Sequence, residues 1–197
     1  MATTNGAHDV KFYFDPVCPW AWRTSLWIRE AAKVRPIRIE WRLFALDTAN
    51  RAAGNPPREV HQQSLVPFRV MVQARRQYGP EVLDRLYLGF GRARHERKET
   101  LNEVQVMERV LEEAGLSKDL IAAALADPTT EEEWQREHAE VAARGAFGVP
   151  TLLIDDAAPL YGPVIGNVPE GEAAGELWDH VLWLSRQPQF YELKRPR

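Results

Sequence analysis

The stretch Asp15-Pro16-Val17-Cys18-Pro19-Trp20-Ala21-Trp22 contains the single cysteine of this 197-residue chain. The apolar run from Lys11 to Phe14 predicts a strand before it, and the amphipathic run from Trp20 to Val34 predicts a helix after it. Pro19 suits the first position of that helix, where a missing N–H removes no hydrogen bond. Cys18 is therefore the expected N-cap residue of the helix.

This position favours a reactive cysteine. The free N–H groups and the positive dipole end of a helix N-terminus stabilise a thiolate, and a partly exposed thiolate of low pKa is a nucleophile at neutral pH. The alternative interpretation is a buried cysteine that packs as a small apolar residue. The run Cys18-Pro19-Trp20-Ala21 also matches a C-x-x-C redox motif with alanine in place of the second cysteine.

Two neighbours of Cys18 have separate expected roles. Trp20, at the third position of the motif, is a candidate wall for an aromatic substrate. A carboxylate beside a thiolate raises the thiol pKa, so we expect Asp15 to order the turn rather than to activate the cysteine.

The composition excludes several classes of function. The chain has 25 Lys and Arg residues against 28 Asp and Glu, a net charge of -3, which gives no overall field toward nucleic acid or an anionic membrane. A single cysteine excludes an intrachain disulfide. A local basic cluster is interrupted by glutamates, and we expect it to be a solvated segment; it consists of Arg92, Arg94, Arg97 and Lys98.

The N-terminal run from Met1 to Asp9 has no apolar core of the kind a signal peptide needs, and residues 1–8 are expected to form a disordered tail. No apolar run approaches the roughly 18 residues of a membrane span. These features predict a cytoplasmic protein that binds neither membrane nor nucleic acid.

The next segment completes a strand–helix–strand unit. Between Ile37 and Leu43, apolar side chains alternate with charged ones, which predicts a half-buried strand. The crossover through the helix from Trp20 to Val34 should be right-handed, with the two strands parallel.

The central part of the chain is predicted to be entirely helical. Residues 47–57 have the composition of a loop, and no convincing strand pattern follows before residue 146. Pro67 should interrupt the first helix of this block, Thr130 and Glu133 match a capping box for the last one, and Gly145 should end it. The helical patterns run from about Glu59 to Gln77, Pro80 to Arg92, Leu101 to Ala114, Ser117 to Ala126 and Glu131 to Arg144.

Strand patterns then return. Thr151 to Ile154 and Leu160 to Val164 flank a turn and predict a hairpin, and a final helix is expected from about Glu172 to Ser185. The order βαβ, helical block, ββα predicts an α/β thioredoxin-like fold with an all-helical insertion and a mixed sheet. Its expected parts are a discontinuous thioredoxin-like domain, residues 9–47 and 146–192, and an insertion domain, residues 58–145.

The loop Phe147-Gly148-Val149-Pro150-Thr151 is the second part of the predicted site. In a thioredoxin-like fold this loop faces the cysteine and its Val-Pro peptide bond is cis. The Val149 backbone would then lie beside Cys18, where an extended thiol peptide could pair with it. The alternative is an ordinary loop proline.

Histidines are weaker candidates. His95 lies in the helical block, which could fold over the thiol, and there it would hold a thiol cofactor or substrate; a surface histidine is the alternative. His61, His138 and His180 show no metal-ligand spacing with one another or with Cys18, so no metal site is predicted.

The chain resembles the DsbA-like family of thioredoxin-fold proteins, most closely its actinobacterial mycothiol-dependent nitroreductase branch. The cysteine motif and the proline loop indicate the superfamily, and the C-terminal runs indicate the branch. The matching stretches are Phe14 to Trp22, Val149-Pro150-Thr151, Tyr161-Gly162-Pro163-Val164, Gly171 to Asp179 and Phe190 to Arg195.

This resemblance implies chemistry with a low-molecular-weight thiol, mycothiol or glutathione, on an electrophilic or disulfide substrate. Cys18 matches the attacking cysteine of the family and Pro150 its cis-proline. Ala21 departs from the branch, which has a resolving cysteine there, so a second free thiol must release any mixed disulfide. The expected thiol- and substrate-binding residues are Pro19, Trp20, Ala21, Val149, Pro150, Thr151 and His95.

Two classes of function follow. The first is a monothiol, thiol-dependent oxidoreductase in which Cys18 forms a mixed disulfide, with a kappa-type glutathione transferase or 2-hydroxychromene-2-carboxylate isomerase-like enzyme as the enzymatic alternative. The second is a non-catalytic thioredoxin-fold binding protein. The resemblance also allows a homodimer.

Overall fold

A computed structural model describes residues 6–196 of the chain and contains one mixed sheet. The strand order is β2-β1-β3-β4; β1 and β2 are parallel, and the pairs β1–β3 and β3–β4 are antiparallel. This confirms the predicted α/β fold with a parallel βαβ unit and a C-terminal hairpin. The strands are β1 His8–Phe14, β2 Ile37–Leu43, β3 Thr151–Ile154 and β4 Leu160–Tyr161.

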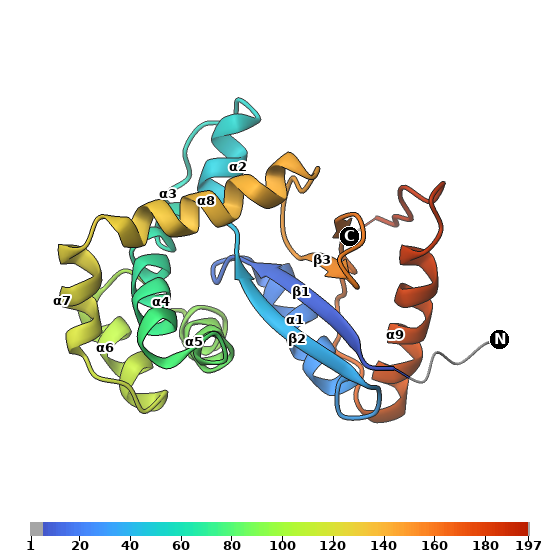
Figure 1. The fold of residues 1–197 in the computed structure, drawn as a ribbon, viewed down its shortest axis with the longest axis horizontal. Helices are drawn as coiled ribbons and strands as arrows, with labels where there is room; N and C mark the ends of the chain where they lie inside the picture. The colour runs from blue at the N-terminus through green and yellow to red at the C-terminus, as the bar shows by residue number, and fades with distance from the viewer. Residues whose placement is uncertain (1–5, 197) are drawn as a thin grey trace.

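Two helices complete the thioredoxin-like core. Helix α1, Pro19–Ala31, connects β1 to β2, and α9, Gly171–Ser185, packs against it (Figure 1). The indole Nε1 of Trp27 donates a hydrogen bond to the Ala174 carbonyl at 3.1 Å and joins the two helices in the core. Helix α1 ends at Ala31, whereas the sequence predicted its end at Val34, a residue that is 36% exposed.

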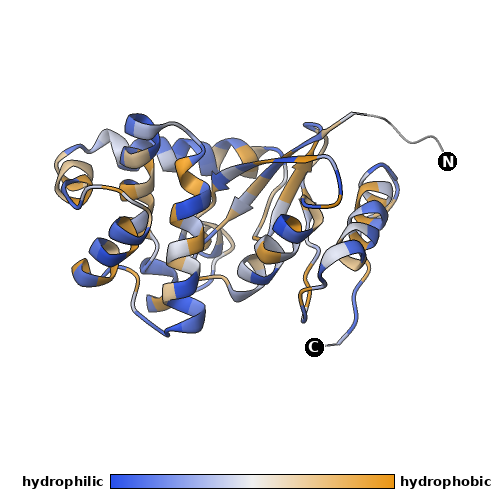
Figure 2. Ribbon diagram, turned by 90° about the horizontal axis from the view of Figure 1, so that it is seen from below, coloured by the Kyte–Doolittle hydropathy of each residue, from blue (hydrophilic) through white to orange (hydrophobic). Residues whose placement is uncertain are grey.

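The helical block lies on the other side of the sheet from α9 (Figure 1). Apolar and polar segments alternate along its helices, as expected for amphipathic helices around a shared core (Figure 2). Helix α2, Leu46–Ala52, precedes the block. The elements of the block are α3 Glu59–Gln62, α4 Leu65–Tyr78, α5 Val82–Gly91, the π-helix η1 Arg92–Glu96, α6 Val104–Glu113, α7 Asp119–Ala126 and α8 Thr129–Ala143.

Two predicted boundaries of the block need correction. Residues 47–57 do not form a loop throughout, because α2 occupies their first half. The helix predicted from Glu59 to Gln77 breaks at Gln63 and Ser64, before Pro67. The proline ring collides with the carbonyl four residues earlier, so the break falls where Gln63 would have continued the helix.

The predicted capping box of α8 is wrong. The Thr130 hydroxyl donates to the carbonyls of Ala124 and Asp127 instead of accepting from the helix. The Asp127 carboxylate accepts from the Thr129 N–H at 2.9 Å and takes the capping role. The predicted end of the helix is confirmed, since Gly145 follows it with φ 104.

The two ends of the sheet also differ from the prediction. Strand β4 ends at Tyr161, before the predicted Val164, and a cis Gly162–Pro163 peptide follows it. His8 belongs to β1 and not to a tail, and its Nδ1 lies 2.7 Å from the Asp155 carboxylate. Residues 1–5 of the predicted tail lie outside the described residues.

The core joins the sheet to the helical block. The ring of Tyr87 on α5 stacks on Phe14 of β1 with 3.8 Å between ring centroids, and it meets Trp41 of β2 edge-on. All three side chains are buried. No helix among the described residues is long and apolar enough to span a membrane.

Candidate active site

Cys18 lies at the junction of β1 and α1. It is the N-cap residue of α1, with an extended backbone (φ -78, ψ 114), and Pro19 begins the helix as predicted. The Ala21 N–H donates to Sγ at 3.4 Å, and Sγ donates to the Val149 carbonyl at 3.5 Å. The cysteine is only 6% exposed, less than the partly exposed thiol that we expected.

The proline loop faces the cysteine, as predicted. The Val149–Pro150 peptide bond is cis. The Thr151 hydroxyl donates to the Gly148 carbonyl at 2.7 Å within the loop. Thr151 therefore holds the loop, while Val149 supplies the contact with Cys18.

His95 contacts the loop before the cysteine. Its Nε2 lies 2.9 Å from the Pro16 carbonyl, and its ring stacks on Trp22 at 5.9 Å. Burial lowers the pKa of His95 to about 4, so at neutral pH the ring is neutral and Nε2 can donate to that carbonyl. His95 therefore positions the cysteine loop.

Asp15 orders the turn, as expected. Its buried carboxylate accepts from the N–H groups of Val17 and Leu46 and from the Ser64 hydroxyl. Burial raises the pKa of Asp15 to about 6, against the lowering effect of these hydrogen bonds. The carboxylate connects the cysteine loop to the first turns of α2 and α4.

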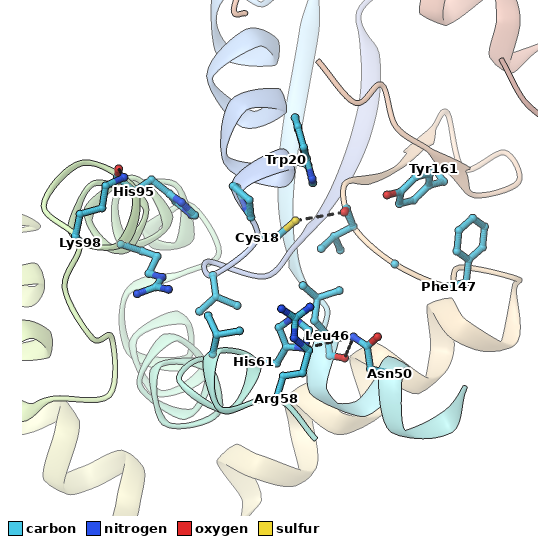
Figure 3. A pocket seen from close by; sticks show the side chains of 16 residues that line it. Cys18, Trp20, Leu46, Asn50, Arg58, His61, His95, Lys98, Phe147 and Tyr161 are labelled. Carbon is cyan, nitrogen blue, oxygen red and sulfur yellow. Dashed lines mark hydrogen bonds between the residues drawn. The ribbon is translucent and has the colours of Figure 1, made fainter. Parts of the chain in front are cut away.

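A cavity of about 780 Å³ opens beside the thiol. Figure 3 shows His95 and Lys98 on one side of Cys18 and Phe147 and Tyr161 on the other. Among the predicted site residues, those that line the cavity are Cys18, Pro19, Trp20, His95 and Val149, and those that do not are Ala21, Pro150 and Thr151.

The sequence did not identify the remaining walls. Arg94 and Lys98 belong to the segment predicted to be solvated, but both line the cavity, whereas Arg97 pairs with Glu99. Arg94 lies within the π-helix η1, and Lys98 follows it with a positive φ of 61. The other cavity residues that the sequence did not point to are Leu46, Asn50, Arg58 and Val60. Phe147 belongs to the predicted proline loop, whereas His61 and Tyr161 were named only for a metal site and for the family resemblance.

Metal chemistry has no visible support in this site. Among residues 6–196, no group of three histidine, cysteine or acidic side chains is placed to hold a metal ion. The site itself combines one sulfur, a helix N-terminus and an open cavity.

These features define the class of protein as a DsbA-like member of the thioredoxin fold. The probable DsbA oxidoreductase SCO1869 of Streptomyces coelicolor superposes with a TM-score of 0.66 at 17% identity, covering 96% of this chain and 94% of that one. A 2-hydroxychromene-2-carboxylate isomerase superposes with a TM-score of 0.65 at 19% identity, covering 91% of this chain and 97% of that one.

The chain belongs to the Rv2466c-like family, described as that of the mycothiol-dependent nitroreductase Rv2466c, which matches residues 17–195. It is also 37% identical over 190 residues to the uncharacterised protein Rv2286c of Mycobacterium tuberculosis, covering 95% of this chain and 82% of that protein. The resemblance read from the sequence is thereby confirmed, and the family is one of thiol-dependent oxidoreductases.

Proposed function

We propose that the protein is a monothiol, mycothiol-dependent oxidoreductase that acts on disulfides. The Cys18 thiolate attacks the mycothiol sulfur of a mixed disulfide, forms a bond to it and releases the other half as a thiolate, which takes a proton from water. A second mycothiol thiolate then attacks this sulfur, giving mycothiol disulfide and free Cys18. The net reaction converts one mixed disulfide and one thiol into one disulfide and one thiol.

The position of the Cys18 sulfur carries this proposal. The Ala21 N–H points at Sγ, and the positive end of α1 favours a negative charge there. The Val149 carbonyl on the opposite side accepts from the protonated thiol and orients it. Because Sγ lines an open cavity, a small disulfide can approach despite the low exposure of the residue.

The absence of a second cysteine determines the cycle. Cys18 is the one cysteine in the chain, so an intrachain disulfide cannot release the bound thiol. An external thiol must do so, and the family points to mycothiol as that thiol. A thiol of this kind fits the cytoplasmic location expected from the sequence, which stays a prediction, as does a homodimer.

A transferase or isomerase of the kind named by one structural neighbour is the second candidate. The same single cysteine favours it, because such a reaction needs no resolving cysteine. The thiol would then be bound for reaction with an electrophile and would form no disulfide with Cys18. A non-catalytic binding protein would show neither behaviour.

Intact mass spectrometry separates these functions. The wild type and a Cys18→Ser variant are incubated with mycothiol disulfide and, separately, with glutathione disulfide. We expect one mycothiol adduct on the wild type and none on the variant, and free mycothiol should then remove the adduct. An unmodified wild type, with Cys18 alkylated only after unfolding, would refute the exchange mechanism and leave a structural cysteine.

A further inference from the structure

The cavity beside Cys18 carries an excess of positive charge. Its walls include Arg58, Arg94 and Lys98, and no aspartate or glutamate lines it. Figure 3 shows Arg58 on the far wall from Trp20 and Lys98 at the side near His95.

These cations are not neutralised by ion pairs. Within residues 6–196, neither Arg58, Arg94 nor Lys98 pairs with a carboxylate, whereas Arg76, elsewhere in the helical block, pairs with Asp127 and Glu133. Arg94 and Lys98 donate to the carbonyls of Glu99 and His95, which carry no net charge. A cationic cavity of this kind attracts anions from solution.

Acidic residues near the cavity do not cancel the charge. The carboxylate of Asp15 is buried behind the wall and already accepts three hydrogen bonds. Asp47 is also buried and pairs with Arg51 at 2.7 Å. Glu59 and Glu99 adjoin Arg58 and Lys98 in sequence but do not line the cavity, and Glu99 pairs with Arg97 and Arg109.

The other side of the cavity is aromatic. Phe147 is 71% exposed and lies against Tyr161, with 5.0 Å between the ring centroids. The half-buried ring of Trp20 also lines the cavity, with the Arg23 guanidinium 5.2 Å from its centroid. Exposed aromatic surface beside a reactive group is typical of a small-molecule site.

We propose that this cavity binds a carboxylate-bearing aromatic or apolar molecule, with the carboxylate attracted to the cationic walls of Arg58, Arg94 and Lys98 and the apolar part against Trp20, Phe147 and Tyr161. Arginine suits this role because its planar fork matches a carboxylate. The inference rests on the proposed function in one respect, namely that the bound molecule is the reaction partner of Cys18. The carboxylate belongs either to the small thiol, as in glutathione, or to the second substrate, since mycothiol carries none.

Isothermal titration calorimetry tests the proposal without requiring any reaction. The probes are 4-nitrobenzoate, the neutral 4-nitrobenzamide of similar size, and S-methylglutathione, which carries the carboxylates of the thiol. At low salt we expect an anion to bind about tenfold more tightly than the neutral amide, and about 0.5 M NaCl should remove most of this preference.

Variants locate the charge. Arg58→Gln and Arg94→Gln should each reduce the preference for the anion several-fold, and the double variant should abolish it while leaving 4-nitrobenzamide unchanged. Arg92→Gln is the matched control, because Arg92 lies in the same π-helix but does not line the cavity. Its preference should equal that of the wild type.

The outcomes separate this inference from the proposed function. If the affinity for 4-nitrobenzoate depends on Arg58 and Arg94, the carboxylate belongs to the second substrate. If only the affinity for S-methylglutathione depends on these arginines, the carboxylate belongs to the small thiol. The anion site would be overturned if 4-nitrobenzoate and 4-nitrobenzamide bind equally and S-methylglutathione does not bind. It would also be overturned if Arg92→Gln reduces the preference for the anion as much as the cavity variants do. Both conclusions hold even if Cys18 forms its adduct. Charge-selective binding without an adduct would refute the exchange mechanism alone.

Discussion

Cys18 occupies a position where helices usually place serine, threonine, aspartate or asparagine. Its sulfur accepts from the Ala21 N–H as those oxygen atoms do, at the longer distance of 3.4 Å. Because of this position, a negative charge on the sulfur is stabilised by the positive end of the α1 dipole. The residue that donates this N–H, Ala21, also stands at the position of the second cysteine of a C-x-x-C motif.

Ala21→Cys should therefore convert the single-cysteine cycle to a dithiol cycle. With mycothiol disulfide and no added free mycothiol, the wild type should retain its mycothiol adduct, whereas in the variant the new thiol should attack that adduct and leave an intrachain disulfide. Intact mass would show the adduct replaced by a protein lighter by two hydrogens.

The matched control for this substitution is Ala21→Ser, which adds a side chain of similar size at the same fully buried position without a thiol. The serine variant should keep the mycothiol adduct. Persistence of the adduct in Ala21→Cys as well would mean that the two sulfurs cannot reach each other in this loop.

His95 should make the stability of the fold depend on pH. The pKa of His95 is lowered to about 4 in the fold by burial, against about 6.5 in an unfolded chain. Between these values the unfolded state binds more protons, so the contribution of His95 to stability falls as the pH drops from 6.5 toward 4. At pH 5 we expect a loss of about 1–2 kcal/mol relative to pH 7.5.

Urea unfolding of His95→Phe at the two pH values measures this effect. Phenylalanine can still stack on Trp22 but cannot donate to Pro16 or titrate, so the difference in stability between wild type and variant should shrink at pH 5. The comparison needs the variant because Asp15, whose pKa is raised to about 6, acts in the opposite direction between pH 3.8 and 6. A difference that does not change with pH would place His95 in solvent.

The residues around the thiol show how far sequence alone could go. Cys18, Pro19 and the proline loop were predictable because each has a strong local requirement, a helix N-cap, a helix start and a turn before a strand. The cationic wall was not, because Arg94 reaches the cavity through the π-helix, whose extra residue per turn leaves no pattern in a single sequence.

Among the elements, α8 provides a polar link between the helical block and the sheet, beside the aromatic contacts of α5. Glu137 is buried at 6% exposure, and its carboxylate accepts from the Leu43 N–H at the end of β2. It also pairs with Arg75 of α4 at 2.7 Å and with Arg42 of β2 at 3.3 Å. One side chain thus joins three elements.

Glu137→Ala should lower the free energy of unfolding by about 3 kcal/mol, because it leaves buried donors without their acceptor. Glu133→Ala is the control, since Glu133 pairs with Arg75 and Arg76 nearer the surface, and it should cost about 1 kcal/mol or less. Urea unfolding measures the two losses in the free energy of unfolding, provided that this free energy depends on urea concentration with the same slope in both variants. Equal losses would mean that the link to β2 contributes nothing.

The order of elements was predictable from periodicity, and their boundaries were not. The alternation in β2 and the amphipathic runs are local signals, and both elements formed where expected. Helix α2 was missed because the contacts that support it come from distant parts of the chain: the Leu46 N–H donates to Asp15, and Asp47 is buried. Its seven residues, Leu-Asp-Thr-Ala-Asn-Arg-Ala, have no apolar stripe that would predict a helix.

At the scale of the whole molecule, the predicted thioredoxin-like domain and the predicted insertion share one core among the described residues. Tyr87 of the insertion is fully buried against Phe14 of β1, and the Arg29 guanidinium of α1 lies 4.0 Å from the Trp41 ring centroid and 5.6 Å from that of Tyr87. Buried residues of both parts form one cluster. We propose that the two predicted domains are units of sequence that share one folding unit.

Calorimetry of the intact chain should then show one unfolding transition. Tyr87→Ala opens a cavity at the junction and should cost about 3–5 kcal/mol, which would lower the single Tm by roughly 10 °C. Because the lost contacts belong to both parts, the far-ultraviolet signal of the helices and the near-ultraviolet signal of the tryptophans should shift together. Two transitions, with only the helical one moved by the substitution, would show that the insertion folds on its own and that the site depends on the docking of two separate domains.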